Sequence, residues 1–169
     1  FMTKLQILAL LLASIALIFF TSCESESFQE PDVYKITPDL RLRINQGMKS
    51  TSKSDRKIFN EKFDRFIEKC DELSYTSNPY TCMETPEYQD FKEFMLSSSP
   101  NVSYLLMDKF LKKEIDFFSY IIHDILMASQ PAIMDLISEQ MKSVGTLEES
   151  FYLYPQLCLN IWVDALDNQ

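Results

Sequence analysis

Apolar residues recur at steps of three and four positions along much of the chain, beginning after residue 54. This period places them on one face of an α-helix, so residues 55–75 are predicted to form an amphipathic helix. Ser54 suits the N-cap position, because its hydroxyl can accept a hydrogen bond from the first helical turn. The predicted buried face consists of Phe59, Phe63, Phe66, Ile67, Cys70 and Leu73.

Three residue pairs that end in proline mark the starts of further helices: Thr85-Pro86, Ser99-Pro100 and Gln130-Pro131. Proline is favoured at the first helical position, where its missing N–H has no helical partner to lose. Between Ser99-Pro100 and Gln130-Pro131, the stretch from Ile115 to Leu126 is apolar enough to form a central helix. The predicted buried faces are Tyr88, Phe91, Phe94 and Met95; Val102, Leu105, Leu106 and Phe110; Ile115, Phe118, Ile121, Ile122, Ile125 and Leu126; and Ile133, Leu136, Ile137 and Met141.

A last helical region is predicted after Gly145, with Thr146 and Glu149 in capping-box positions. Pro155 is expected to interrupt this region early. Several short helices with brief connections predict an all-α fold: one small domain of about five or six amphipathic helices, covering residues 52–169. The last part of the core is expected from Leu157, Ile161, Trp162 and Leu166.

The segment that precedes this domain, residues 33–51, is only weakly patterned. Leu40, Leu42 and Ile44 alternate there with arginines. An alternation of period two is typical of a strand, so we expect one short strand or an extended arm. Residues 23–51 are thus predicted to be a tether and lead-in.

The N-terminal 22 residues have the pattern of a signal peptide. Lys4 precedes an apolar run from Ile7 to Phe20 that only Ser14 interrupts. The run spans about 14 residues, fewer than the roughly 20 that a helix needs to cross a bilayer. A basic residue followed by a short apolar run indicates a secretory signal.

The four residues Phe20-Thr21-Ser22-Cys23 end this segment, and they resemble the lipobox of bacterial lipoproteins. In that family the cysteine is acylated and the signal is removed just before it, so the resemblance implies that Cys23 is lipidated. Phe20 departs from the leucine that is usual there. Two alternatives remain: cleavage after Cys23 with free secretion, and an uncleaved anchor, against which the shortness of the run argues.

The nine residues from Glu24 to Asp32 are polar and acidic, without periodic apolar positions. Such a stretch buries too little surface to order itself. It resembles the surface-export signal of Bacteroidetes lipoproteins, and a solvated spacer explains it equally well. Glu24 is also not the aspartate that favours inner-membrane retention in proteobacteria. We therefore expect a lipid-anchored protein of the bacterial outer membrane, facing either the periplasm or the cell surface.

The charge of the remaining chain limits its partners. Beyond residue 22 there are 15 basic and 25 acidic residues, because Lys4 is the only charged residue before that point. The net charge of −10 repels nucleic acid and anionic headgroups, and leaves basic proteins, cations and neutral ligands. Gly47 and Gly145 are the only glycines. Rossmann and phosphate-loop sites need several, so no cofactor of that kind is expected.

Besides Cys23, the cysteines are Cys70, Cys82 and Cys158. An exported protein meets an oxidising compartment, where disulfides persist. Cys70 and Cys82 flank a loop that contains Asn78-Pro79, so they are the predicted pair, and Cys158 is predicted to be a buried free thiol. The spacing matches no metal-binding motif, and no metal is expected.

Residues 85–165 also resemble a small HEAT-like helical module of bacteria. The resemblance rests on Thr85-Pro86-Glu87-Tyr88 through Phe94, on residues 102–107 and 121–126, and on Ile161-Trp162. Ser97-Ser98-Ser99-Pro100 replaces the usual "L-G-x-x-A" turn of that module. The resemblance implies stacked helical hairpins and a protein-binding surface, with no catalytic residues.

No catalytic constellation is predicted. His123 is the only histidine and is followed by Asp124. Adjacent helical residues point about 100° apart, so Asp124 is poorly placed to orient the imidazole. The carboxylates Asp64, Glu68, Asp71 and Glu72 fall on the polar side of the first helix, where they form either a solvated face or a docking patch for a basic partner.

Four tyrosines fall in or near predicted loops and are the candidate interaction patch: Tyr75, Tyr80, Tyr152 and Tyr154. We therefore expect a non-catalytic interaction subunit or adaptor, anchored in the membrane through Cys23 and bound to a protein partner. Two alternatives remain. One is an immunity-type lipoprotein that neutralises a toxin, and the other is a carrier of a hydrophobic ligand.

Overall fold

A computed structural model describes residues 35–73, 79–113, 118–142, 144 and 147–168, with the backbone alone at 79, 118–119 and 147–152. The chain divides into two compact units, residues 1–31 and 32–169, and all described residues belong to the second. The predicted signal segment, Cys23 and the acidic tether lie outside the described residues. None of the helices described there combines the length and hydrophobicity that a bilayer crossing requires.

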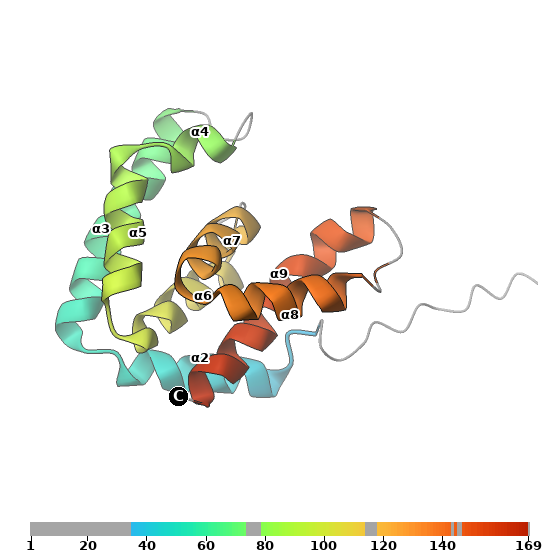
Figure 1. Ribbon diagram of the computed structural model, residues 1–169. Helices are drawn as coiled ribbons and strands as arrows, with labels where there is room; N and C mark the ends of the chain where they lie inside the picture. The colour runs from blue at the N-terminus through green and yellow to red at the C-terminus, as the bar shows by residue number, and fades with distance from the viewer. Residues whose placement is uncertain (1–34, 74–78, 114–117, 143, 145–146, 169) are drawn as a thin grey trace, which may run out of the picture. The chain divides into compact units, whose positions relative to one another are not determined.

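The described chain is helical and contains no strand, which confirms the predicted all-α class (Figure 1). Most helices are short and are joined by brief connections. The elements are α2 (Pro38–Ser50), α3 (Lys53–Glu72), α4 (Pro79–Met83), α5 (Pro86–Ser97), the 3-10 turn η2 (Pro100–Val102), α6 (Ser103–Leu111), α7 (Phe118–Ser129), α8 (Pro131–Met141) and α9 (Leu147–Asp167).

Helix starts follow the predicted chemistry in most places. Thr85 caps α5, where its hydroxyl accepts a hydrogen bond from the backbone N–H of Tyr88, and Pro86 stands in the first turn. The N-cap of α3 is Ser52 and not the predicted Ser54, so that helix begins two residues earlier. The α8 helix starts at Pro131 as expected, but without a side-chain cap from the preceding glutamine.

The strand or extended arm predicted within residues 33–51 is wrong, because this segment contains helix α2. Thr37 caps it, accepting a hydrogen bond from the N–H of Leu40. Leu40 and Ile44 are four residues apart and therefore share one helical face, which is buried, whereas Leu42 is 54% exposed. This helix packs on α6 and α9. The helical domain accordingly begins before residue 52, and this part of the chain is not a tether.

Helix α9 continues through Pro155, so the predicted early interruption is also wrong. Proline removes one backbone hydrogen bond and costs about 3 kcal/mol in a helix interior. Leu153, Leu157 and Leu159 lie on either side of it and are each at most 3% exposed. Burial of several large side chains outweighs the local cost. Likewise, the loop expected around Asn78-Pro79 gives way at Pro79 to the five-residue helix α4.

Aromatic rings form the contact between α3 and α5. The ring centroid of Phe91 on α5 lies 5.6 to 5.8 Å from those of Phe59, Phe63 and Phe66 on α3. Tyr88, one turn earlier on α5, lies 5.1 Å from Phe66. Offset-stacked and edge-to-face pairs at such distances add to the stabilisation that comes from burial alone.

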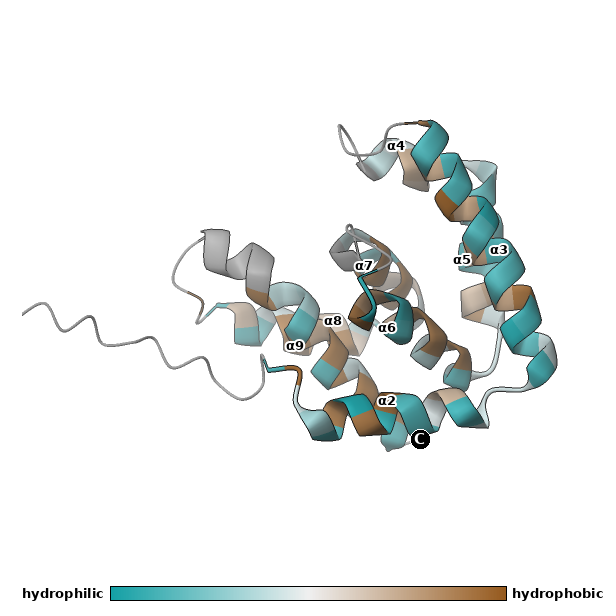
Figure 2. Cartoon of the chain, turned by 180° about the vertical axis from the view of Figure 1, so that it is seen from behind, coloured by the Kyte–Doolittle hydropathy of each residue, from teal (hydrophilic) through white to brown (hydrophobic). Residues whose placement is uncertain are grey.

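The remaining core joins α7, α8 and α9, and α5 packs on α7. Figure 2 shows hydrophilic and hydrophobic residues mixed along single helices such as α3, as amphipathic helices require. The predicted faces are largely buried, but Leu73 and Leu136 are 40% and 49% exposed. Core residues of this second group include Ile121, Ile122, Ile125, Leu126, Ile133, Ile137, Leu157, Ile161 and Trp162.

Candidate functional site

One face of α7 brings two of the predicted tyrosines together. Tyr120, His123 and Met127 are spaced by three and four residues, so they lie on one side of the helix. His123 is exposed and Met127 is 51% exposed. Tyr80 from α4 and Tyr154 from α9 flank these residues. We call the five side chains the α7 strip.

Tyr80 lies at one end of the α7 strip, where it contacts Tyr120. Its ring lies 5.1 Å from that of Tyr120, between centroids, with the two planes at 74°. This edge-to-face arrangement is favourable between aromatic rings. Tyr80 remains 58% exposed.

Tyr154 lies beside the middle of the strip, where it contacts His123. Its hydroxyl lies 3.0 Å from Nδ1 of His123, and the tautomer of the imidazole decides which group donates. Burial, together with the neighbouring Cys158, raises the pKa of Tyr154 above its ordinary value. The phenol is therefore neutral over the physiological pH range, and it holds the imidazole in place as a hydrogen-bonding group rather than as an ion.

The sequence missed part of this surface. Tyr120 and Met127 were not expected to belong to it, although their spacing from His123 would have identified them once that histidine was known to be exposed. Of the other predicted tyrosines, Tyr75 lies outside the described residues. Tyr152 falls within α9, at a position where the structure describes the backbone alone.

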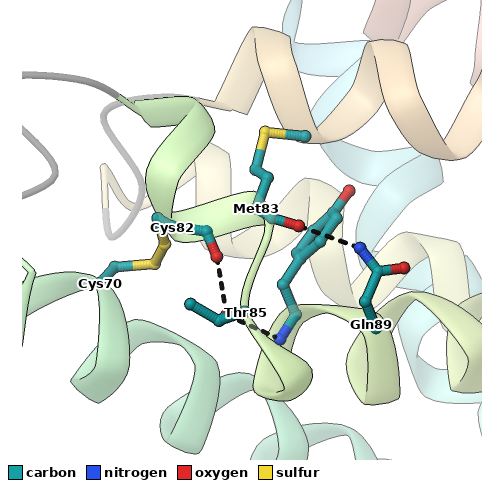
Figure 3. Close-up of a disulfide and its surroundings, with 6 residues drawn as sticks. Cys70, Cys82, Met83, Thr85 and Gln89 are labelled. Carbon is teal, nitrogen blue, oxygen red and sulfur yellow. Dashed lines mark hydrogen bonds between the residues drawn. A yellow bond between two sulfur atoms is a disulfide. The ribbon is translucent and has the colours of Figure 1, made fainter.

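A disulfide helps to position α4, and with it Tyr80. Cys70, near the end of α3, is bonded to Cys82 on α4, with 5.0 Å between their Cα atoms (Figure 3). The hydroxyl of Thr85 donates a 2.7 Å hydrogen bond to the carbonyl of Cys82, and the side-chain amide of Gln89 donates to the carbonyl of Met83. These contacts attach α4 to both α3 and α5.

The third described cysteine, Cys158, is a buried free thiol. Burial raises the pKa of this thiol to about 12, although the nearby Tyr154 hydroxyl lowers it in part. The thiolate is the form that acts as a nucleophile or metal ligand, and at neutral pH almost none is present. Cys158 therefore lacks the properties of a reactive cysteine.

His123 and Asp124 have separate partners. Asp124 accepts a 2.7 Å hydrogen bond from the hydroxyl of Tyr88 and forms a 2.7 Å ion pair with Lys92. His123 instead contacts Tyr154, so Asp124 is already engaged elsewhere and does not orient the imidazole. Among the described residues, no group of three or more histidine, cysteine or acidic side chains could hold a metal ion.

A second surface feature lies on α3. It is an open hollow of about 480 Å³, and the described residues that line it all belong to that helix. It brings together all four carboxylates that the sequence placed on the polar side of this helix. The lining residues are Phe63, Asp64, Ile67, Glu68, Asp71 and Glu72.

Comparison with known proteins adds no relative from which a function could be transferred. No protein-family model, no curated protein and no solved structure matches the chain. The resemblance of residues 85–165 to a HEAT-like module stays a prediction.

Proposed function

We propose that this chain is a non-catalytic protein-interaction subunit or adaptor of the bacterial cell envelope, anchored by lipid on Cys23, and that the α7 strip is its binding surface. The observation that carries the proposal is the convergence of Tyr80 and Tyr154 on one exposed face of α7. These residues come from helices far apart in the sequence, so the surface exists only in the folded chain.

The composition of the strip supports a protein partner. Tyrosine and methionine are enriched in protein interfaces, and the energetically dominant positions of interfaces are often tyrosines. A tyrosine ring loses little conformational entropy on binding when it is already held by neighbours. Tyr80 is held by Tyr120, and Tyr154 by His123, so both rings are preorganised for contact.

The chemistry of the titratable groups supports a non-catalytic role. A nucleophile needs an activating base within hydrogen-bond reach and an accessible, ionisable form. Cys158 is buried and protonated, and His123 is oriented by a neutral phenol and not by a carboxylate. The arrangement fits a binding surface better than acid–base or nucleophilic chemistry.

The test is crosslinked affinity purification of the full chain from its native membrane, with partners identified by mass spectrometry. We expect one stoichiometric partner that is lost from the His123→Ala and Tyr80→Ala variants. Leu136→Ala is the matched control, because Leu136 is 49% exposed on α8 and is not part of the strip. Circular dichroism would show that each variant is folded. Equal recovery of the partner by all variants would contradict the assignment of the strip.

The anchor is tested separately. Cys23→Ala should abolish incorporation of labelled fatty acid and release the protein from the outer membrane. Two or three acyl chains are sufficient for stable anchoring, whereas one binds only marginally. Unchanged membrane retention of the variant would contradict lipidation at this residue without affecting the proposal for the α7 strip.

A second candidate function is supported by the acidic hollow on α3. An immunity-type lipoprotein that neutralises a basic toxin would use such a surface, since complementary charge speeds association. The identity of the captured protein separates the two candidates. A toxin that loses its activity when bound favours the second, and a membrane transporter or barrel favours the first.

A further inference from the structure

We propose that the Cys70–Cys82 disulfide is a redox switch for the α7 strip: the bond holds α4 in place, and only then does Tyr80 reach Tyr120. It rests on the proposed function, because it takes the strip as the binding surface, and it adds the condition under which that surface is complete. The switched part is the end of the strip that α4 supplies. The contact at the middle of the strip joins α7 to α9 and does not depend on the bond.

Helix α4 is too short to be stable by itself. It has five residues, whereas isolated helices in water need roughly 12 to 15 before they form to a useful extent. Few of its described side chains hold it in the core, since Tyr80 and Thr81 are exposed and Met83 is half-buried. Cys82, by contrast, is 0% exposed. The side chain by which α4 enters the core most deeply is therefore one half of the disulfide.

The disulfide attaches α4 to α3, and two hydrogen bonds attach it to the start of α5 (Figure 3). The Thr85 hydroxyl donates to the carbonyl of Cys82 at 2.7 Å, and the exposed Gln89 amide donates to the carbonyl of Met83 at 3.0 Å. Two such bonds offset only part of the conformational entropy lost when five residues are ordered. Breaking the S–S bond should therefore release α4 while α3 and α5 stay packed through their aromatic rings.

The place of Tyr80 follows from the place of α4, because little of this side chain is buried. Tyr80 is 58% exposed, and its ring meets that of Tyr120 edge to face at 5.1 Å between centroids. One aromatic pair of this kind adds only modest stabilisation and does not replace a covalent bond. When α4 is released, the strip loses Tyr80 from one end.

The switching step is a thiol–disulfide exchange with an oxidant that itself carries a disulfide. The thiolate of one cysteine attacks the S–S bond of the oxidant, so that a mixed disulfide forms and one thiol leaves. The second cysteine attacks the mixed disulfide, which forms the Cys70–Cys82 bond and expels the second thiol. The cysteine pair gives up two electrons, which reduce the oxidant's S–S bond, and its two protons end on the thiols released.

Burial gives the switch a direction. Cys70 and Cys82 are each 0% exposed once bonded, and exchange requires access of an attacking thiolate to a sulfur atom. The folded, oxidised chain is therefore protected from small thiols. Disulfides form and persist in oxidising compartments outside the cytosol, so an exported chain completes the strip after export and keeps it complete.

The test measures the contact between Tyr80 and Tyr120 and needs no partner. Photo-oxidative coupling joins two tyrosine rings that are in contact, and peptide mass spectrometry identifies the joined pair. The full oxidised chain is compared with the same chain refolded in a dithiol reductant and with Cys70→Ser/Cys82→Ser. We expect the Tyr80–Tyr120 product to fall at least about fivefold in both, since an unattached helix of this length is mostly unformed. Reoxidation with glutathione disulfide should restore the product in the wild-type chain and not in the variant.

A second readout is hydrogen exchange at the backbone. The N–H of Glu84 donates to the carbonyl of Tyr80 at 3.1 Å, and the N–H of Thr85 donates to that of Cys82 at 3.2 Å. Both amides should lose protection in the reduced chain, whereas amides within α3 and α5 should keep theirs. Equal loss of protection throughout α3 and α5 would mean that the domain opens as a whole, which would overturn the inference.

Loss of a disulfide also lowers overall stability, so a destabilised control with an intact bond is needed. Gly47→Ala crowds the ring of Tyr104 at the contact between α2 and α6 and leaves both cysteines in place. It should retain the Tyr80–Tyr120 product. An undiminished product in the reduced chain, or an equal loss in Gly47→Ala, would overturn the inference. The proposed function fails instead if partner capture is unaffected by the strip variants, so the two failures are distinguishable.

Discussion

Gly47 on α2 lies directly against the ring of Tyr104 on α6. A Cβ atom placed on Gly47 would come within 2.3 Å of the ring carbon Cδ2. Tyr104 cannot easily move away, since it is 4% exposed and its hydroxyl donates a 2.7 Å hydrogen bond to Asp167 on α9. The missing side chain at Gly47 is therefore what allows α2 to approach α6 so closely.

The first prediction follows from this contact. Gly47→Ala should destabilise the fold by about 1–3 kcal/mol through overpacking, although alanine is the better helix former by about 1 kcal/mol. Urea unfolding would measure the loss, with Lys49→Ala on the exposed side of α2 as a near-neutral control. The cost should fall when Tyr104 is also replaced by alanine. A stabilised Gly47→Ala variant would show that the two helices are less closely packed.

Tyr88→Phe should destabilise the protein by about 1–2 kcal/mol, because it removes the buried hydroxyl that donates to Asp124. The ring would stay in place, and Lys92 would still pair with the carboxylate. Burial, the hydrogen bond to Asp124 and its charge all raise the pKa of Tyr88, so the phenol remains neutral. Tyr120→Phe is the matched control in chemical denaturation, since its hydroxyl forms no hydrogen bond in the described chain. Equal stability of the two variants would mean that the Asp124 contact contributes little.

Reduction of the Cys70–Cys82 disulfide should lower the free energy of unfolding by about 3 kcal/mol. The two residues are 12 positions apart, and a bridge over a loop of that length restricts the unfolded chain by about this amount. Thermal or urea unfolding with and without a dithiol reductant would measure the difference. The Cys70→Ala/Cys82→Ala double variant should not respond to the reductant. A wild-type chain that is equally indifferent would show that the bond does not form.

The ion pair at the C-terminal end of α9 should make stability depend on acid. Burial alone would raise the pKa of Asp167, but hydrogen bonds from Tyr104 and Arg43 and the Arg43 charge leave it below the ordinary value of 3.8. A carboxylate with a lowered folded-state pKa stabilises the fold above its unfolded pKa, and loses that effect as the pH falls through the folded value.

Asp167→Asn should therefore be less stable than wild type at pH 6, by about 0.5 kcal/mol because the pair is exposed to solvent. The difference should shrink below about pH 4, where the wild-type carboxylate becomes protonated. Asparagine can still accept the Tyr104 hydrogen bond through Oδ1, but its Nδ2 cannot accept from Nε of Arg43, so the substitution removes the charge and that hydrogen bond together. Asp135→Asn, an exposed carboxylate on α8, is the control. A difference that does not vary with pH would contradict the proposed role of the Arg43 pair.

The all-α class and most helix starts could be predicted from local sequence, because apolar period and capping act within a few residues. Thr85-Pro86 and Pro131 begin helices as expected. The same local reasoning failed at α2 and at Pro155. In both places a local signal, an alternating pattern or a helix-breaking residue, was outweighed by burial against helices distant in the sequence.

In the candidate site, too, some features could be predicted from local sequence and others depended on the packing of distant helices. Tyr80 and Tyr154 were predicted interaction residues, whereas His123 was considered only as a possible catalytic group and Tyr120 and Met127 were not expected there. Which of them meet was decided only by the fold, because α4, α7 and α9 must pack before Tyr80 reaches Tyr120 and Tyr154 reaches His123. Sequence by itself determined the residue types and the helical periods, which are local properties. The tertiary structure decided the surfaces, because side-chain contacts over long sequence separations depend on how the helices pack.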